Sequence, residues 1–485
     1  MEISFPAVAW RPVAPYLILT GTALLVILLD LVPPHRRKHH LGVVALFGVV
    51  AALMVSVFLW GQSGRAFRNM VVLDNFALFF DLIFGYSAAL VILLSLDSLR
   101  RRGAELAEYY ILVLFAAGGM ILMASGNDLL IIFLGLEQMS ISLYVLAGFF
   151  RTELRSSESA MKYFLLGAFA TGFFLYGIAL IYGATGTTNL DGIAQTLQQT
   201  PLGRDPLLLI GAALLLVGFG FKISSVPFHM WVPDVYEGAP TPITALIATG
   251  SKAAAFAALL RVLYAPMRGL QPDWVVLFWG LAALTMTLGN VVAIAQSNLK
   301  RMLAYSSIAH AGYMLVGVVA GGAFGTASVL FYLLVYTFTT VGAFGVILLL
   351  ERSGEEAVDI RDYSGLGFRH PVLALTLSFF LLSLIGVPPT AGFVGKVYLF
   401  GAAVRSGYVW LAVIAVVNSA VAAYYYLRLI VYMYMREPEG VETRYAPSFA
   451  GALALGIALW TVFQFGLAPS ALFDLAQGAV APLIR

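Results

Sequence analysis

The feature that most constrains this chain is a succession of apolar runs, each roughly 20 residues long, separated by short polar segments. About 20 helical residues cross the hydrocarbon core of a bilayer. The sequence is 61% hydrophobic and 11% charged, with a mean hydropathy of +0.91, which is far outside the range of soluble domains. We therefore predict an all-α polytopic membrane protein with about fourteen spans, at 14–32, 41–60, 76–96, 109–125, 129–150, 163–184, 207–227, 242–264, 274–295, 302–321, 327–350, 372–400, 408–435 and 449–468.

Other classes are disfavoured by what the sequence lacks. Alternating strand patterns are absent, which argues against a β-barrel, and nothing indicates nucleic-acid binding or a metal site. The first run has no basic segment before it and no small-residue cleavage site after it, so we expect it to remain as a span. The chain has no cysteine, which excludes disulfides, thiolate zinc sites and iron–sulfur clusters. Any redox chemistry is therefore expected on another chain.

The basic residues predict an orientation. Of 28 Lys and Arg, sixteen fall in the odd-numbered loops and eight, with Arg261 counted among them, on the other side. Because short cytoplasmic loops are enriched in Lys and Arg, the first loop, "PPHRRKHH", is predicted to be cytoplasmic and both termini to lie on the outer side.

Five titratable residues lie within apolar runs, where a charge is costly. A charged side chain at the middle of a bilayer costs about 2.5 to 3.5 kcal/mol on insertion scales, so such residues are expected to face a protein interior or water. These residues are Glu137, Lys222, Lys252, His310 and Lys396. A sixth, Arg428, is expected to snorkel toward the cytoplasmic surface.

The spacing of these residues suggests an internal repeat. Glu137 and Lys222 are 85 residues apart and His310 and Lys396 are 86 apart, an offset of about 173. Each copy would hold five helices, an odd number, so the second would be inverted relative to the first. The predicted organisation is a three-helix segment (1–107), a first repeat (108–265, spans four to eight), an inverted second repeat (266–436, spans nine to thirteen) and a last span (437–485).

Two spans are predicted to be discontinuous. Pro227 interrupts the seventh, and Pro388, Pro389 and the glycines after them interrupt the twelfth. Breaks at corresponding positions of inverted repeats indicate an ion pathway, because exposed backbone groups are tolerated only where they line a cavity. We expect Glu137 to load and unload a proton at Lys222, and Lys252, His310 and Lys396 to pass it onward along a water-lined polar axis.

Three stretches carry a family resemblance: "FKISSVPFHMWVPDVYEGAPTPITALIATGSK", "NLKRMLAYSSIAHAGYM" and "PPTAGFVGKVYLF". They resemble the antiporter-like proton-translocating subunits of respiratory complex I, over almost the whole chain. Within that family the chain is most similar to the paralogue without a lateral-helix extension, because it ends after the fourteenth span. It also carries Lys396 in "GFVGK", where another paralogue usually carries a glutamate.

The resemblance implies roles for particular residues. Glu137 and Lys222 match the ion pair of the fifth and seventh spans, Lys252 the connecting lysine of the eighth, and Lys396 the outlet residue of the twelfth. Accessory positions, for which proton uptake and a structural role remain open, are His229, Asp234, Glu237, Lys300 and Tyr305.

The resemblance also implies a complex. The chain would be a proton-translocating subunit of NADH:quinone oxidoreductase in a bacterial inner membrane, beside paralogous subunits. NADH, FMN, iron–sulfur clusters and the quinone, ubiquinone or menaquinone, would belong to partner subunits. Two alternatives remain open: a membrane subunit of a Mrp-type cation/proton antiporter or energy-conserving hydrogenase, and a scaffold subunit that moves no protons.

Overall fold

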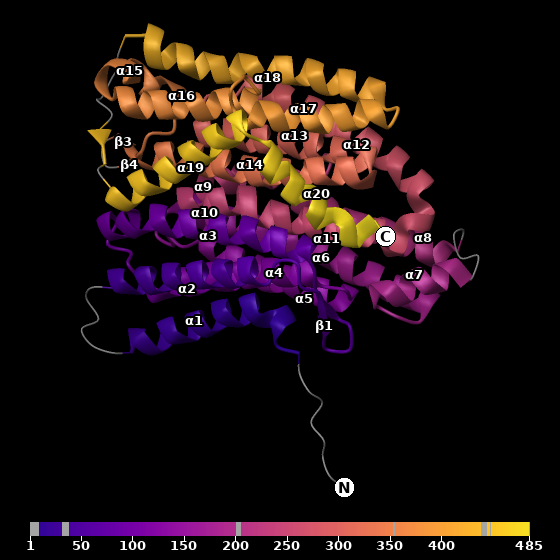
Figure 1. Ribbon diagram of the computed structural model, residues 1–485. Helices are drawn as coiled ribbons and strands as arrows, with labels where there is room; N and C mark the ends of the chain where they lie inside the picture. The colour runs from indigo at the N-terminus through magenta and orange to yellow at the C-terminus, as the bar shows by residue number, and fades with distance from the viewer. Residues whose placement is uncertain are drawn as a thin grey trace.

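The structure is a computed structural model that describes residues 9–31, 38–199, 205–352, 355–437, 444–446 and 448–484. In these ranges the chain is almost entirely helical, and the long helices run side by side (Figure 1). The helices of the first half are η1 (Arg11–Val13), α1 (Ala14–Asp30), α2 (His39–Phe58), α3 (Asn75–Arg101), α4 (Ala107–Ser125), α5 (Leu129–Ala147), α6 (Leu154–Thr185), α7 (Leu190–Gln199), α8 (Pro206–Ile223), α9 (Val232–Gly238), α10 (Thr241–Leu246), the π-helical turn η3 (Ile247–Ser251) and α11 (Lys252–Tyr264).

The second half continues in the same way. Its helices are η4 (Pro266–Leu270), α12 (Gln271–Ile294), α13 (Leu299–Ala320), α14 (Gly322–Leu348), η5 (Ile360–Tyr363), α15 (Leu366–Arg369), α16 (Pro371–Ile385), α17 (Ala391–Arg405), α18 (Val409–Met435), α19 (Phe449–Leu467) and α20 (Ser470–Ile484). Two small antiparallel sheets hold the loops, one of β1 (Gly64–Ala66) and β2 (Val71–Leu73), the other of β3 (Leu350–Arg352), β4 (Glu355–Glu356) and β5 (Arg444–Tyr445).

The predicted spans are confirmed. Thirteen helices of the described residues are long and apolar enough to cross a membrane, and each overlaps a predicted run. The twelfth predicted run is divided between α16 and α17, which together supply a fourteenth crossing. Among the helices that were not predicted is α20, whose 15 residues are too few to read as a span and which packs against α3 and α14.

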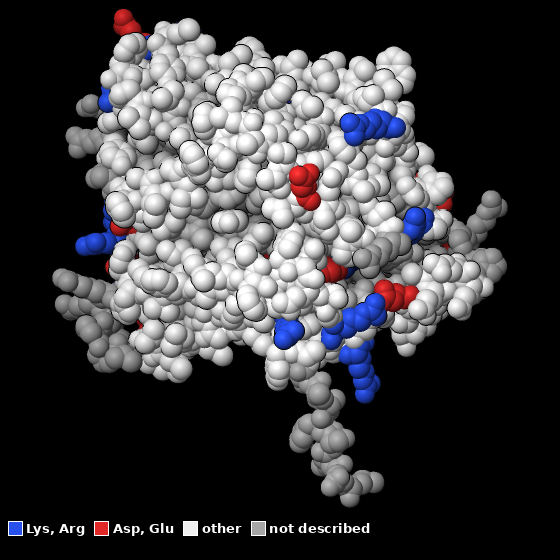
Figure 2. All heavy atoms as spheres, viewed as in Figure 1, with Lys and Arg blue, Asp and Glu red and all other residues white. Residues whose placement is uncertain are grey.

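The loops between these helices gather at two ends of the molecule (Figure 1). We call them the α7 end, on the right of the view, and the α15 end, on the left. Figure 2 shows that Lys, Arg, Asp and Glu are sparse on the visible face and lie mostly toward these ends, as expected for a surface that contacts lipid.

Local hydrogen bonds establish the internal repeat. Asp128 caps α5 and pairs across an isolated bridge with Asn189, whereas Asn298 caps α13 and pairs in the same way with Asp359. In both cases the residues of the second copy lie 170 positions after those of the first. The first motif adjoins α7 and the second precedes α15, so the two copies of this capping motif lie at opposite ends of the molecule (Figure 1). The predicted inversion is thus confirmed.

The helix crossings repeat with the same offset. A side chain at Gly119 of α4 would come within 2.5 Å of the backbone nitrogen of Met139 on α5. A side chain at Gly289 of α12 would come within 2.7 Å of the backbone nitrogen of Ala309 on α13. Both glycines and both neighbours are 170 residues apart, so each repeat opens with the same close crossing of its first two helices.

An arginine on the last helix of each repeat binds the end of the first helix. Arg261 of α11 donates from Nε to the carbonyl oxygen of Ala124 in α4 at 2.8 Å. Arg428 of α18 donates to the carbonyl oxygen of Ile294 in α12 at 2.9 Å. The acceptors are again 170 residues apart, and both are terminal carbonyl groups without helical partners.

These contacts correct the interpretation of one basic residue. Arg261 is 4% exposed and forms an ion pair with Asp74, so it is not a loop residue that sets orientation. Arg428 is partly exposed and binds the carbonyl groups of Ile294 and Gln296 at the end of α12. Four other basic residues used for the orientation, Arg36, Arg37, Arg204 and Arg485, lie outside the described residues.

The two breaks are where they were predicted, but their relation to the lysines is different. The seventh span is interrupted between Ile223 and Val232, and the twelfth between Ile385 and Ala391. Lys222 precedes its break and Lys396 follows its own. The prediction that these lysines are counterparts at an offset of 173 is therefore wrong. That offset was taken from the titratable residues, whereas the helix caps and helix crossings repeat at an offset of 170.

Candidate functional site

Lys222 lies in the last turn of α8, just before the break, and is 3% exposed. Its Nζ donates to the hydroxyl of Ser140 on α5 at 2.7 Å. The rings of Tyr144 and Tyr163 lie 5.3 and 5.4 Å from the same nitrogen. The hydroxyl of Tyr144 accepts a second hydrogen bond at 3.5 Å, so this amine is held by two hydroxyl groups and by aromatic faces that attract a cation.

Glu137 lies one turn before Ser140 on α5 and is partly exposed. The expected ion pair with Lys222 is not formed: the ion pairs of the described residues, counted to 4.0 Å, include none between them. Instead, Oε1 of Glu137 is buried without a hydrogen-bond partner. The hydroxyl of Ser140, and not the carboxylate of Glu137, therefore contacts Nζ of Lys222.

Lys252 is the first residue of α11 and directly follows the π-helical turn η3. It is 1% exposed. Its Nζ donates to the carbonyl oxygen of Ser307 at 2.6 Å and to the hydroxyl of the same residue at 2.5 Å. Turns of this kind are frequent at functional sites, and here the turn leaves the lysine on a polar patch of α13.

His310 lies one turn after Ser307 on α13 and has both ring nitrogens occupied. Nδ1 lies 2.7 Å from the hydroxyl of Tyr332, and Nε2 lies 3.3 Å from that of Tyr426, which also contacts Ser306. A neutral imidazole donates from one nitrogen and accepts at the other. The ring therefore joins two hydroxyl groups on opposite sides of itself.

Lys396 lies on α17 and turns back toward the break. Its Nζ donates to the carbonyl oxygen of Ile385, the last residue of α16, at 2.8 Å, and to the hydroxyl of Ser419 at 2.7 Å. Because the last carbonyl groups of a helix have no helical partner, the break supplies the acceptor that this buried lysine needs.

Aromatic rings connect Lys252 with two residues of the second repeat, His310 and Lys396. The ring of Tyr336 lies 5.8 Å from Nζ of Lys252 and 5.2 Å from the ring of His310. The ring of Tyr313 lies 5.5 Å from that of His310 and 4.7 Å from Nζ of Lys396. We call Lys222, Lys252, His310 and Lys396, in this order, the buried axis.

The link between the first two lysines is more apolar. Trp231, just before α9, stacks on Tyr163 with ring centroids 4.6 Å apart and contacts Tyr236 at 6.4 Å. The hydroxyl of Tyr236 lies 3.2 Å from that of Ser307, which binds Lys252. Between Lys222 and Lys252 the axis thus passes an aromatic cluster carried by the broken span.

The accessory residues form an ion-pair network at the α15 end. Asp234 accepts hydrogen bonds from Lys162 at 2.7 Å and Arg301 at 2.8 Å, and Glu237 accepts from Arg301 at 2.8 Å. Both acids lie on α9. The network therefore fastens α9, which follows the break, to α6 and α13.

The remaining accessory residues are not joined to one another. Lys300 is buried, donates to the carbonyl oxygen of Ala239 at 2.8 Å and pairs with Glu356 at 3.6 Å. His229 is half-buried in the break, and its Nδ1 has no hydrogen-bond partner. Tyr305 is partly buried on α13.

Burial and charge act in opposite directions on Asp234. Partial burial raises the pKa of its carboxyl group, but the hydrogen bonds and charges of Lys162 and Arg301 outweigh this and hold the pKa below its ordinary value. The acid is thus held in its charged form, which suits a structural role in the network.

Several residues of the site were missed because they are ordinary polar residues in apolar runs. The hydroxyl groups that bind the axis belong to Ser140, Ser307, Ser419, Tyr332 and Tyr426. Serine and tyrosine are common in membrane helices, so composition alone does not distinguish them. The offset of 170 would have found two of them, since it places Ser307 at the position of Glu137 and His310 at that of Ser140.

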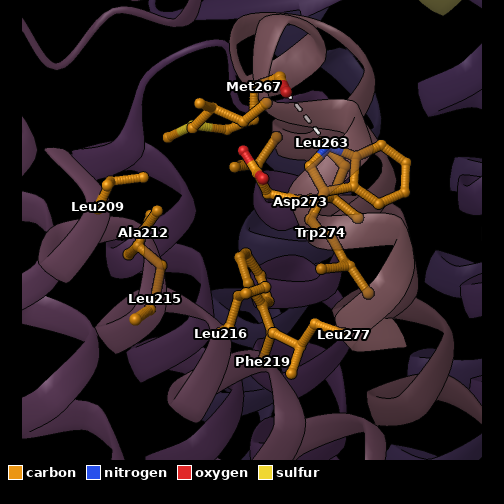
Figure 3. A pocket seen from close by; sticks show the side chains of 14 residues that line it. Leu209, Ala212, Leu215, Leu216, Phe219, Leu263, Met267, Asp273, Trp274 and Leu277 are labelled. Carbon is orange, nitrogen blue, oxygen red and sulfur yellow. Dashed lines mark hydrogen bonds between the residues drawn. The ribbon is translucent and has the colours of Figure 1, made fainter. Parts of the chain in front are cut away.

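An apolar groove near the surface lies elsewhere. Figure 3 shows it between α8, α11 and α12, lined by apolar residues such as Leu216 and Phe219, with Asp273 and Trp274 at one side. None of the residues of the buried axis lines it. The described residues contain no group of three His, Asp or Glu that could hold a metal ion.

The chain is similar to known membrane subunits. The family model "NADH:quinone oxidoreductase/Mrp antiporter, TM" matches residues 126–422. NADH-quinone oxidoreductase subunit N of Trichlorobacter lovleyi is 50% identical over 98% of both chains. A chain of respiratory complex I from Thermus thermophilus superposes with a TM-score of 0.81 at 39% identity, covering 96% of this chain and 99% of that one. A chain of the Mrp complex from Dietzia shares the fold, with a TM-score of 0.86 at 21% identity and 98% coverage of each chain.

Proposed function

Since this chain belongs to the NADH:quinone oxidoreductase/Mrp antiporter family, we propose that it is a proton-translocating membrane subunit of NADH:quinone oxidoreductase, of the subunit N type. Redox chemistry then takes place on partner subunits that carry NADH, FMN, iron–sulfur clusters and the quinone, and this chain moves protons. The Mrp alternative has less support, because the Mrp chain is only 21% identical whereas the subunit N relative is 50% identical.

The observation that carries the proposal is the chain of polar contacts along the buried axis. Four buried titratable groups each have a hydroxyl or carbonyl partner from another helix, and aromatic rings bring Lys252, His310 and Lys396 within one side chain of each other. A scaffold subunit would gain nothing from three buried lysines, each of which is costly in a membrane.

The residues divide the work as follows. Lys222 takes a proton when the charge of Glu137 changes, and Ser140, which contacts the lysine one turn from the acid, transmits that change. Lys252 holds the next proton on Ser307, whose hydroxyl can accept and donate. His310 takes a proton at one ring nitrogen and releases one from the other, and Lys396 holds the last on the carbonyl oxygen of Ile385, which also accepts from Ser419.

The direct test is proton translocation per NADH oxidised in vesicles. We expect Lys252→Met to lose most of it, because methionine fills the volume but holds no proton. The matched control is Lys38→Met, which removes a lysine paired with Asp30 at the end of α1, away from the axis. Unchanged translocation in Lys252→Met, per assembled complex, would remove the axis from the mechanism.

Membrane orientation is part of the proposal. From the basic loops we propose that the α15 end faces the cytoplasm of a bacterium and that the α7 end, with both termini, faces the outer side of the inner membrane. Because the chain has no cysteine, single-cysteine variants test this directly. An impermeant maleimide should label Ser406→Cys in intact cells, and should label Thr152→Cys only after the membrane is opened.

A further inference from the structure

The two arginines that close the repeats differ in their partners. Arg261 donates from Nε to a carbonyl group, and its two other nitrogens form a fork on the carboxylate of Asp74, at 2.9 and 3.0 Å. Asp74 caps α3, a helix outside the repeat. The guanidinium charge is thus neutralised by a neighbouring helix that the N-terminal segment supplies.

Arg428 has the same place in the second repeat but no carboxylate. Its fork lies on two carbonyl groups, those of Ile294 at 2.9 Å and Gln296 at 2.5 Å, and its Nε is buried without a partner. Among the described residues, the ion pairs include none with Arg428. A buried donor without a partner costs about 1 to 3 kcal/mol, so this side chain is incompletely satisfied.

The surroundings of Arg428 leave room for another helix. The side chain is partly exposed between α12 and α18, and the apolar residues around it are open: Val291 is 56%, Tyr424 58% and Leu427 44% exposed. In the first repeat the corresponding side of α4 is covered by α3, which carries Asp74. No helix of the described residues takes that place in the second repeat.

We infer that the face of α12 and α18 around Arg428 docks on a neighbouring membrane subunit, which supplies an Asp or Glu side chain to Arg428 as α3 supplies Asp74 to Arg261. The inference rests on the proposed function, which makes the chain part of a multisubunit complex. On docking, the guanidinium turns so that Nε binds the carbonyl oxygen of Ile294 and the fork binds the carboxylate. This movement gives the orphaned Nε a partner and neutralises the charge.

The first measurement leaves Arg428 in place. A photocrosslinking amino acid at Leu427, next to Arg428 on the open face, is activated in membranes that hold the whole complex, and crosslinked peptides are identified by mass spectrometry. We expect a crosslink to one membrane subunit, within reach of an Asp or Glu. Crosslinks to lipid alone, or to a protein segment without an acid, overturn the inference.

The second measurement tests the charge. Arg428→Gln should lower the yield of that crosslink more than about tenfold, since removing one partner of a desolvated charge pair is costly. Neutralising the identified acid should have the same effect, and exchanging the two charges should restore the crosslink. The matched control, Arg405→Gln, removes a guanidinium at the other end of the molecule, where it lies over Phe324, and should leave the yield unchanged.

The outcomes separate this inference from the proposed function. If NADH-oxidising subunits do not copurify with the chain, the proposed function fails, whereas an acid-dependent crosslink would still establish the docking face. If they do copurify and Arg428→Gln leaves the crosslink intact, the docking inference alone fails.

Discussion

The close crossing of α12 and α13 provides a sharp test of how the second repeat is held together. We consider Gly289→Ala. The added Cβ would lie 2.7 Å from the backbone nitrogen of Ala309 and 3.0 Å from the carbonyl oxygen of Tyr305, whereas ordinary contacts begin at 3.4 Å. The added Cβ is thus about 0.7 Å too close to a backbone atom, which cannot rotate away as a side chain could. The two helices must therefore move apart.

The magnitude follows from two opposing effects. Overpacking of a well-packed interior costs about 1 to 3 kcal/mol, while replacing glycine by alanine within a helix returns about 0.5 to 1 kcal/mol. We expect a net loss of about 1 to 2 kcal/mol in the stability of the chain. Since α13 carries His310 and Ser307, the separation should also lower proton translocation per assembled complex.

The same helix offers a matched control. Gly280 of α12 has no atom within 4 Å of an added Cβ, so Gly280→Ala should gain about 0.5 to 1 kcal/mol. The assay is the midpoint of thermal unfolding of the solubilised complex, followed by the fraction of this chain that stays soluble. Equal midpoints for Gly289→Ala and Gly280→Ala would refute the argument from the crossing.

Three further predictions concern charges. Lys396→Ala should stop translocation while leaving assembly intact, and Lys396→Arg should also be impaired because a guanidinium does not release its proton; normal pumping per assembled complex in the alanine variant would make Lys396 structural. Asp74→Asn leaves the buried Arg261 without its counter-charge and should cost about 3 to 5 kcal/mol, seen as a lower level of the chain in membranes; Asp205→Asn, at an exposed helix start, is the control and should change that level little. The pKa of Asp234 is held below its ordinary value, so this group contributes stability that is present above its unfolded-state pKa and is lost as pH falls through its folded-state pKa. The midpoint of thermal unfolding should therefore decline only in acid. A decline already between pH 8 and 6 that Asp234→Asn abolishes would contradict this.

The sequence predicted the spans and the axis for one physical reason. Lipid tolerates few polar groups, so the length of each apolar run and every charge within one carry information. Lys222, Lys252, His310 and Lys396 were identified as charges or polar rings within apolar runs. The structure confirms that all four are buried between helices, and their roles in transport stay predictions.

The sequence could not show which side chains contact one another. Arg261 lies near the end of an apolar run, where a solvated arginine and a buried one look alike, and its partner Asp74 is 187 residues away. Direct pairing of Glu137 and Lys222 was inferred from their charges and from the family resemblance, but the hydroxyl of Ser140 contacts the lysine instead. The repeat offset was also taken from charged residues, while the capping residues Asp128 and Asn298 follow the backbone more faithfully.

The position of each lysine relative to its break has a consequence for directionality. In Figure 1 the chain runs from α8 toward α9 in one direction and from α16 toward α17 in the opposite one. Lys222 lies before its break and Lys396 after its own, so both lie on the side of the break that faces the α7 end. Duplication has made the backbone pseudosymmetric between the two faces of the membrane, but the charges are polarised toward one. A proton that enters from one face of the membrane therefore meets these sites in a different order from a proton that enters from the other face. The path itself is thus directional.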